Sequence, residues 1–172
     1  MRLTPPAIAI AVLLATVSSV SHGQRSDRHI DARSLALTRE GQAEADAGRY
    51  ESATDAFESA LAIDPENRSA YLALASVAKK QALPGKAIRL YREALLMEPN
   101  DVVALAGQGE ALVAKGAVTK AKENLAKVRS LCVATCSEQV ALAAAIERSG
   151  TGPALSAQTV TPRPVATVGK SN

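Results

Sequence analysis

The chain has few of the residues that mark catalytic, nucleic-acid and metal sites. Its 172 residues include no tryptophan, one phenylalanine, three tyrosines, two cysteines and two histidines. So few aromatic rings argue against a surface on which single-stranded nucleic acid stacks. The net charge of +3 is small, and the basic residues are too scattered to suggest a nucleic-acid partner. No Ser/His/Asp arrangement, histidine pair for zinc or glycine-rich phosphate loop is present, so we expect no enzyme activity, no cofactor and no metal.

No apolar run is long enough for an ordinary membrane span. The longest, Ala7–Val17, is broken only by Thr16, whereas a transmembrane helix needs about 20 apolar residues. A positive start at Arg2 and small polar residues up to Gly23 complete the layout of a signal peptide. We therefore predict that residues 1–23 are removed and that the chain is exported, to a bacterial periplasm. The alternative is that the run is retained as an uncleaved anchor.

What the chain does have is a period of 34 residues. The first set of residues in the period is Ala53, Phe57, Ala60 and Pro65, and the second is Ala87, Tyr91, Ala94 and Pro99. In each set the first three residues share one helix face, because they are spaced at i, i+4 and i+7. The proline then stops the helix. A fixed period of this length predicts stacked helix pairs.

With the residues upstream, this pattern resembles the tetratricopeptide repeat. The matching positions are Leu37, Gly41, Gly48 and Tyr50 before the first set, Tyr71, Leu74 and Ala75 before the second, and Leu105, Gly109, Leu112, Gly116, Ala121 and Leu125 in a third copy. The first copy departs from the family at Glu40 and Glu44, and the third at Val128 and Val133. The resemblance implies an all-α, helix-turn-helix solenoid of about three repeats with a C-terminal capping helix. An unrelated alanine-rich helical bundle is the alternative.

The resemblance divides the chain into segments. A lead-in at 24–33, repeats at 34–67, 68–101 and 102–135, a capping helix at 136–149 and a tail at 150–172 follow the signal peptide. We expect helices at 32–47, 50–63, 69–81, 84–97 and 102–115, then one ending near 131, and a last one over 137–149. Asp31 can cap the first helix, and Gly150 can end the last. The tail is rich in Gly, Pro, Ser and Thr without a helical period, so we expect it to be disordered.

Charge is distributed unevenly along the chain. Residues 24–67 carry five arginines and ten acidic residues, a net charge of −5, whereas residues 68–101 carry +3 and residues 102–149 carry +2. Ordinary solvated helix faces account for such a gradient. The alternative is weak head-to-tail self-association, or a partner of matching polarity.

The only cysteines, Cys132 and Cys136, bracket the turn before the capping helix. In an exported chain a pair is expected to form a disulfide, and its main effect here would be to fix the direction of the capping helix. A Cu(I) or redox site is the alternative, since soft thiolates suit that ion. Copper would need a histidine, and His29 lies about 100 residues upstream. The ending also resembles the tails of some exported bacterial tetratricopeptide-repeat proteins.

The family resemblance implies a ligand groove lined by the first helix of each repeat. The candidate binding residues are Thr38, Arg39, Gln42, Asp46, Ser76, Lys79, Lys80 and Glu110, with Leu72, Ala73, Val103, Ala106 and Gly107 among them in the groove. The best-known subgroup holds a C-terminal carboxylate with Lys, Asn and Arg, and those positions here are occupied by Thr38, Gln42, Ala73, Val103 and Gly107. That type of clamp is therefore absent.

Together these features predict an exported, non-enzymatic adaptor that binds a protein or peptide in its groove. Two alternatives remain. One is a metal or redox accessory protein that uses Cys132 and Cys136, and the other is a structural subunit of an envelope complex.

Overall fold

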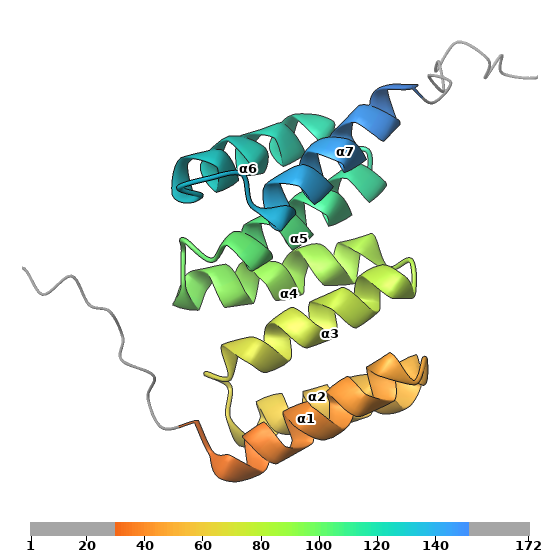
Figure 1. Ribbon diagram of the computed structural model, residues 1–172. Coiled ribbons are helices and arrows are strands. Elements are labelled where there is room, and N and C mark those ends of the chain that lie inside the picture. The colour runs from red at the N-terminus through yellow and green to blue at the C-terminus, as the bar shows by residue number, and fades with distance from the viewer. Residues whose placement is uncertain (1–29, 152–172) are drawn as a thin grey trace, which may run out of the picture.

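The computed structural model describes residues 30–151 and consists there of seven helices without a strand. Figure 1 shows them stacked in chain order, from the first two helices at the bottom to the last two at the top. They are α1 (Ala32–Asp46), α2 (Tyr50–Ile63), α3 (Arg68–Lys80), α4 (Pro84–Met97), α5 (Val102–Ala114), α6 (Val118–Leu131) and α7 (Ser137–Thr151). The predicted all-α solenoid of three helix pairs plus a capping helix is confirmed. Residues 1–29 and 152–172, with the signal-peptide prediction and nearly all of the tail prediction, lie outside the described residues.

Four helix ends differ from expectation by one or two residues, and α3 also begins one residue earlier than predicted, at Arg68. α1, α3 and α5 each end one residue earlier than predicted, because the following residue is the C-cap. α7 continues through Thr151 rather than stopping at 149, so Gly150 is inside the helix and not its end. The predicted cap of α1 is confirmed, since the Asp31 carboxylate accepts a hydrogen bond from the Arg33 backbone N–H at 2.8 Å.

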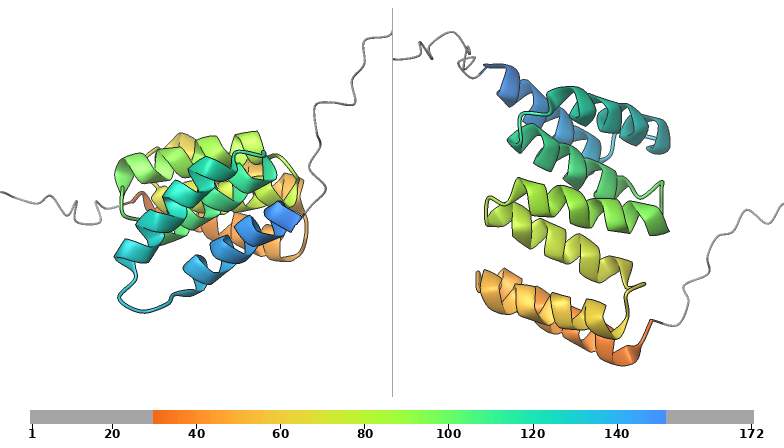
Figure 2. Two further views of the ribbon diagram at one scale, coloured as in Figure 1. Left: turned by 90° about the horizontal axis from the view of Figure 1, so that it is seen from above. Right: turned by 180° about the vertical axis from the view of Figure 1, so that it is seen from behind.

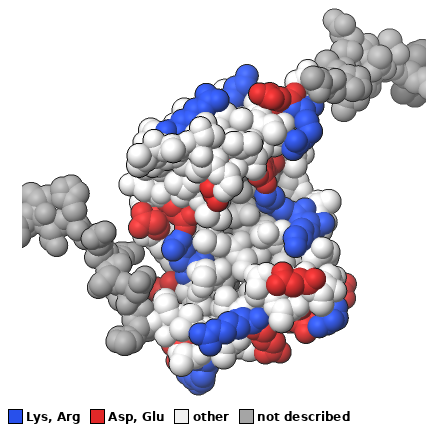
Figure 3. Space-filling view, in the orientation of Figure 1, with Lys and Arg blue, Asp and Glu red and all other residues white. Residues whose placement is uncertain are grey.

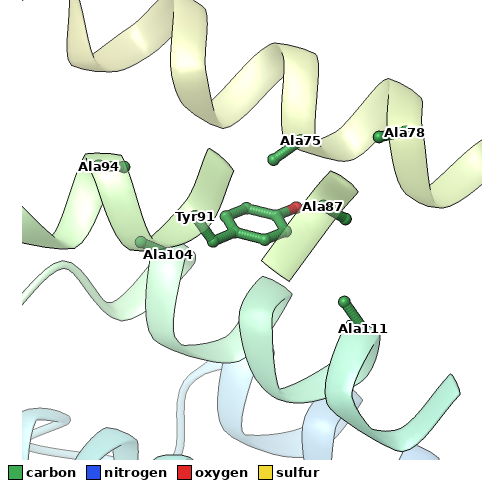
Figure 4. Close-up of a cluster of buried hydrophobic side chains, with 7 residues drawn as sticks. All are labelled: Ala75, Ala78, Ala87, Tyr91, Ala94, Ala104 and Ala111. Carbon is green, nitrogen blue, oxygen red and sulfur yellow. The ribbon is translucent and has the colours of Figure 1, made fainter. Parts of the chain in front are cut away.

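The residues of the 34-residue period form the core. Ala53, Phe57, Ala60, Ala87 and Ala94 are 0% exposed. Figure 4 shows the ring of Tyr91 surrounded by alanines of α3, α4 and α5. Small residues allow the helices to approach closely, and an aromatic ring in each of the first two repeats, with Leu125 at the same position of the third, fills the remaining space.

At two glycines of α5, a side chain from a neighbouring helix occupies the space that a Cβ atom would need. A Cβ added to Gly107 would come within 2.3 Å of the Tyr91 ring, and one added to Gly109 within 2.7 Å of Leu142. Gly107 therefore lets α5 approach α4, and Gly109 lets it approach α7. The repeat pattern predicts a small residue at the second of these positions only.

The turns inside the three helix pairs share one backbone conformation. Gly48, Ala82 and Gly116 occupy equivalent positions 34 residues apart, and their φ angles are 75°, 57° and 80°. Glycine adopts this left-handed conformation freely, whereas alanine is strained in it. The second repeat therefore carries strain in its turn that the other two avoid.

Consecutive repeats are joined where each odd-numbered helix begins, and we call these joints junctions. At the first junction the buried Asn67 caps α3, and its amide donates to the hydroxyls of Ser34 and Thr38 at 2.7 and 2.9 Å. At the second, Asp101 caps α5 and forms an ion pair with Arg68. Both of these junctions link the first residue of one repeat to the N-cap residue of the next repeat's first helix. The two linked residues, Ser34 and Asn67 or Arg68 and Asp101, are 33 positions apart.

The third junction, between α6 and α7, has neither kind of link. Thr135 occupies the position of Asn67 and Asp101 but is exposed. Beside it, the sulfur atoms of Cys132 and Cys136 lie at disulfide distance, with the Cα atoms 6.1 Å apart. The pair stands directly between the end of α6 and the start of α7.

The capping helix α7 packs against α5 more extensively than α5 packs against α3 or α3 against α1. α3 touches α1 at few positions, and α5 touches α3 at equally few, but α7 lies along α5 as well as along α6. It buries Leu142 completely between them. Both views of Figure 2 show α7 beside α5 and α6 at one end of the stack. None of the described helices is both long and apolar enough to cross a bilayer.

At the opposite end, α1 presents an uncovered face. Ala36 and Ala43 are exposed, whereas the residues in the same register of α3, Ala70 and Val77, are 0% and 2% exposed beneath the preceding helix pair. α1 thus repeats the register in which α3 receives a neighbour, but no other helix of residues 30–151 packs on this face.

Candidate functional site

A groove of about 310 Å³ opens between α3, α5 and α7. Most of its surface comes from small or apolar side chains, with polar groups at its borders. Its lining residues are Leu72, Ser76, Lys79, Tyr91, Val103, Ala106, Gly107, Glu110, Ser137, Glu138 and Ala141. α3 and α5 place their residues there because the repeat fixes which face each first helix turns inward. α7 contributes because it lies along α5.

One ion pair crosses the groove. Lys79 of α3 pairs with Glu110 of α5, and each side chain is about one quarter exposed, at 26% and 27%. Glu138 supplies a second carboxylate from the first turn of α7, where the helix dipole favours a negative charge. Its only described hydrogen bond is accepted from the Ser137 hydroxyl at 2.9 Å, and no described residue forms a salt bridge with it. The groove therefore holds two carboxylates and one ammonium group.

Tyr91 places a hydroxyl group at the bottom of the groove. The residue is 4% exposed, and its hydroxyl forms no hydrogen bond with another group of residues 30–151. The oxygen is not one of the fully buried atoms without a partner, so solvent in the groove reaches it. Burial, and then the negative charge of Glu110, raises the pKa of Tyr91 to about 12. The hydroxyl is consequently protonated at neutral pH and can donate or accept a hydrogen bond. Because Gly107 has no side chain, the phenol ring lies directly against the backbone of α5 there.

A second hollow continues from the groove along α5 and α7. It has a volume of about 650 Å³ and shares Glu110 and Ala141 with the groove. Four of its eight lining residues are alanines, and Arg148 is another. The two hollows together make an elongated surface rather than a closed cavity.

The structure brings together three of the eight candidate residues predicted from sequence. Ser76, Lys79 and Glu110 line the groove, with Leu72, Val103, Ala106 and Gly107. Glu110 and Lys79 neutralise one another, which spacing alone did not indicate.

The other five candidates lie elsewhere. Thr38 belongs to the first junction, where its hydroxyl donates to the Ser34 carbonyl at 2.8 Å and accepts from Asn67. Gln42 and Asp46 bond to each other at 2.8 Å on exposed α1, and Arg39 is exposed on the same helix. Lys80 places its ammonium group 5.6 Å from the centre of the Tyr50 ring. None of these five lines the groove.

Sequence reasoning missed four groove residues. Tyr91 is predicted only as a core aromatic, and it is indeed buried at 4% exposure although it also lines the groove. Ser137, Glu138 and Ala141 come from α7, which was expected only to cover the end of the stack. No signal in the repeat could have placed them, because α7 is outside the repeat.

The cysteine pair is not part of a cluster of potential metal ligands among the described residues. Within residues 30–151 no group of three or more His, Cys, Asp or Glu side chains is close enough to hold an ion. His29, which the copper alternative requires, lies outside those residues.

Figure 3 shows charges of both signs scattered over a mostly uncharged face, without a large area of one sign.

Comparisons with known proteins agree with the architecture. Two family models described as tetratricopeptide repeat match residues 35–77 and 69–101. No match was found among curated proteins. Among solved structures, the first tetratricopeptide-repeat domain of Spaghetti (RPAP3), bound to the HSP90 peptide SRMEEVD, is similar with a TM-score of 0.64 and 20% identity, over 72% of this chain and 98% of that one.

Two further structures are similar. The second such domain of human RPAP3, in complex with the HSP70 peptide SGPTIEEVD, has a TM-score of 0.62 and 21% identity, over 67% of this chain and 95% of that one. MamA has a TM-score of 0.55 and 24% identity, over 57% of each chain. At these identities the likeness establishes the fold alone.

Proposed function

Since the chain is a tetratricopeptide-repeat protein, we propose that it is an exported, non-enzymatic interaction module that holds a segment of a partner protein in the groove between α3, α5 and α7. The observation that carries the proposal is the groove itself. Its lining consists of small and apolar residues with a few polar groups, among them the Tyr91 hydroxyl, which forms no hydrogen bond with another described group. A concave, mostly apolar surface with a few fixed polar groups is the usual form of a binding site.

The similar structures support a peptide as the ligand. Two of them were solved with short peptides bound, SRMEEVD and SGPTIEEVD. The adjoining hollow extends the groove along α5 and α7, which suits an extended segment better than a compact small molecule.

Peptide binding can be tested by selecting binders from a random peptide library displayed on phage. Ala141 lines the groove but is exposed, so Ala141→Trp would fill the groove without disturbing the core. Val140, its neighbour, is 55% exposed and does not line the groove, which makes Val140→Trp the matched control. We expect selected peptides to lose binding to the first variant and keep it with the second. Peptides that bind both variants equally, or a selection that yields no binders, would overturn the proposal.

Export is supported by the signal-peptide layout and by the cysteine pair, since disulfides persist in oxidising compartments. The intact mass of the protein from its host, with and without alkylation of thiols, tests both points. We expect a chain that begins at or near Gln24 with no alkylated cysteine. A full-length chain with two free thiols would contradict export and would make metal loading the next experiment.

Weak self-association remains a separate prediction from the charge gradient. Sedimentation at low salt and high protein concentration would reveal it, and a monomer under those conditions would rule it out.

A further inference from the structure

We infer that the groove selects a partner segment carrying an arginine or lysine side chain, which enters between Glu110 and Glu138. The inference rests on the proposed function and names the chemical class of its ligand. It depends on three features: the shape of the groove, its charge, and the hydroxyl of Tyr91.

The shape suits a long side chain with an apolar stem. Ala106 of α5 and Ala141 of α7 are among the smallest residues of the wall and leave most of the groove's volume free. Lys and Arg bury their methylene stems on apolar surface while their charged ends reach polar groups.

The charge of the groove favours a cation. Lys79 neutralises Glu110, and the carboxylate of Glu138 remains without a described salt bridge. An arriving guanidinium or ammonium group would share Glu110 with Lys79 and give Glu138 its missing counter-charge. A ligand carboxylate would instead face both glutamates, and like charges brought together in this way are strongly unfavourable.

The Tyr91 hydroxyl supplies a third contact. It has no described hydrogen-bond partner and is not among the fully buried unpaired atoms, so it meets solvent in the groove beside Glu110. Its oxygen can accept a hydrogen bond from a guanidinium or ammonium N–H. A ligand that displaces water from the groove must replace the bond between water and this hydroxyl, so a ligand that pairs the hydroxyl binds more tightly than one that leaves it unpaired. Arginine fits best, because its planar fork offers five donors to the phenol and the two carboxylates.

The two peptides bound in the similar structures both end in Glu-Glu-Val-Asp; SGPTIEEVD has no basic residue, and SRMEEVD has one arginine beside its three acidic residues. Here the clamp positions for a terminal carboxylate hold Thr38, Gln42, Ala73, Val103 and Gly107, none of which is positively charged.

The experiment uses the full chain in its native redox state. Groove-dependent peptides from the phage selection are synthesised with blocked ends and a fluorescent label, each beside a twin in which every Arg or Lys is replaced by Gln. Fluorescence anisotropy measures both, with end-blocked SGPTIEEVD as the acidic comparison. We expect each parent peptide to contain a basic residue, the Gln twin to bind roughly tenfold more weakly, and the acidic peptide to bind least.

Two variants locate the cation. Glu138→Gln should weaken the basic peptides at least about fivefold, with most of the loss at low salt, whereas Glu147→Gln on the exposed side of the same helix should not. Tyr91→Phe keeps the ring and removes the hydroxyl, and it should also weaken them.

The outcomes separate the two proposals. Groove-dependent peptides without a basic residue, or basic peptides indifferent to both Glu138→Gln and Tyr91→Phe, would overturn this inference and leave the peptide-binding function in place. A selection without any groove-dependent peptide would overturn both.

Discussion

The first and second junctions perform the same structural task with different chemistry. In each, a side chain at the start of one repeat reaches the residue that caps the first helix of the next. The first junction uses neutral groups, with Asn67 bonded to Ser34 and Thr38. The second uses an ion pair, Arg68 with Asp101. The repeat therefore conserves the geometry of the joint within this chain and leaves the chemistry free.

The difference predicts how each junction responds to its surroundings. Asn67 is 1% exposed and fully hydrogen-bonded, so its contribution should be insensitive to salt. Arg68 is 43% exposed at its side chain, so its ion pair should be partly screened. The third junction differs again, because in the described part of the chain a disulfide, Cys132–Cys136, stands where the other junctions have a hydrogen bond or an ion pair.

Removing the neutral link should have the largest effect. Asn67→Ala removes the cap of α3 and leaves the oxygens of Ser34 and Thr38 without their donor, so we expect the free energy of unfolding to fall by about 3 kcal/mol. Urea denaturation measures it. Asn100→Ala, in the equivalent turn but exposed, is the control and should change little. Equal effects from the two would mean that the network adds nothing beyond an ordinary turn.

Removing the covalent link should have the next largest effect. With Cys132 and Cys136 both replaced by serine, we expect a loss of about 2 kcal/mol from loop-closure entropy. Hydrogen exchange should show the loss chiefly in α7, since it alone follows the bond. A reducing agent should destabilise the native chain and leave the double variant unchanged. Identical exchange in α7 of both proteins would show that Leu142 and its neighbours hold the helix without the bond.

Breaking the ion pair should have a smaller effect that depends on salt. We expect Arg68→Gln to cost about 1 kcal/mol at low salt, because Asp101 loses its counter-charge, and less at about 1 M salt, where charges are screened beyond ~3 Å. The control is Arg92→Gln, an exposed arginine of α4 without an ion pair among the described residues. A loss that is the same at both salt concentrations would mean that Arg68 acts through its stem and not its charge.

The smallest effect should come from an ion pair that stays inside one repeat. A hydrogen bond and the charge of Arg49 lower the pKa of the partly exposed Glu44. A carboxylate with a lowered pKa stabilises the fold above its unfolded-state pKa, and that contribution disappears as the pH falls through the folded-state pKa. NMR titration should show the pKa of Glu44 returning to its ordinary range in Arg49→Gln but not in Arg39→Gln. An unchanged pKa in both would show that the pair does not persist in solution.

The sequence predicted the repeat and its core well, because periodicity determines which face of each helix is buried. Phe57, Tyr91 and their flanking alanines were assigned to the core from spacing alone, and they are buried. The same register placed Ser76, Lys79 and Glu110 on the inner face of α3 and α5, where the structure brings them together.

What the sequence did not predict lies where periodicity ends. The position of α7 depends on a five-residue connection and on Leu142 meeting Gly109, and neither feature repeats. The same limit explains why the α1 candidates do not line the groove. Gln42 and Asp46 bond to each other, and Thr38 bonds to Asn67. A repeat pattern describes neighbours inside the array and not the helices at its ends.

The two ends of the stack also differ in whether a further repeat could be added to them. Ala36 and Ala43 keep α1 in the register that α3 uses to receive a preceding helix pair. A further repeat fused upstream would therefore find a face of the right shape, whereas one fused downstream would have to displace α7 from α5. For protein engineering, the chain is a terminal module: arrays built from it can be lengthened at the amino end, with α7 as the fixed stop.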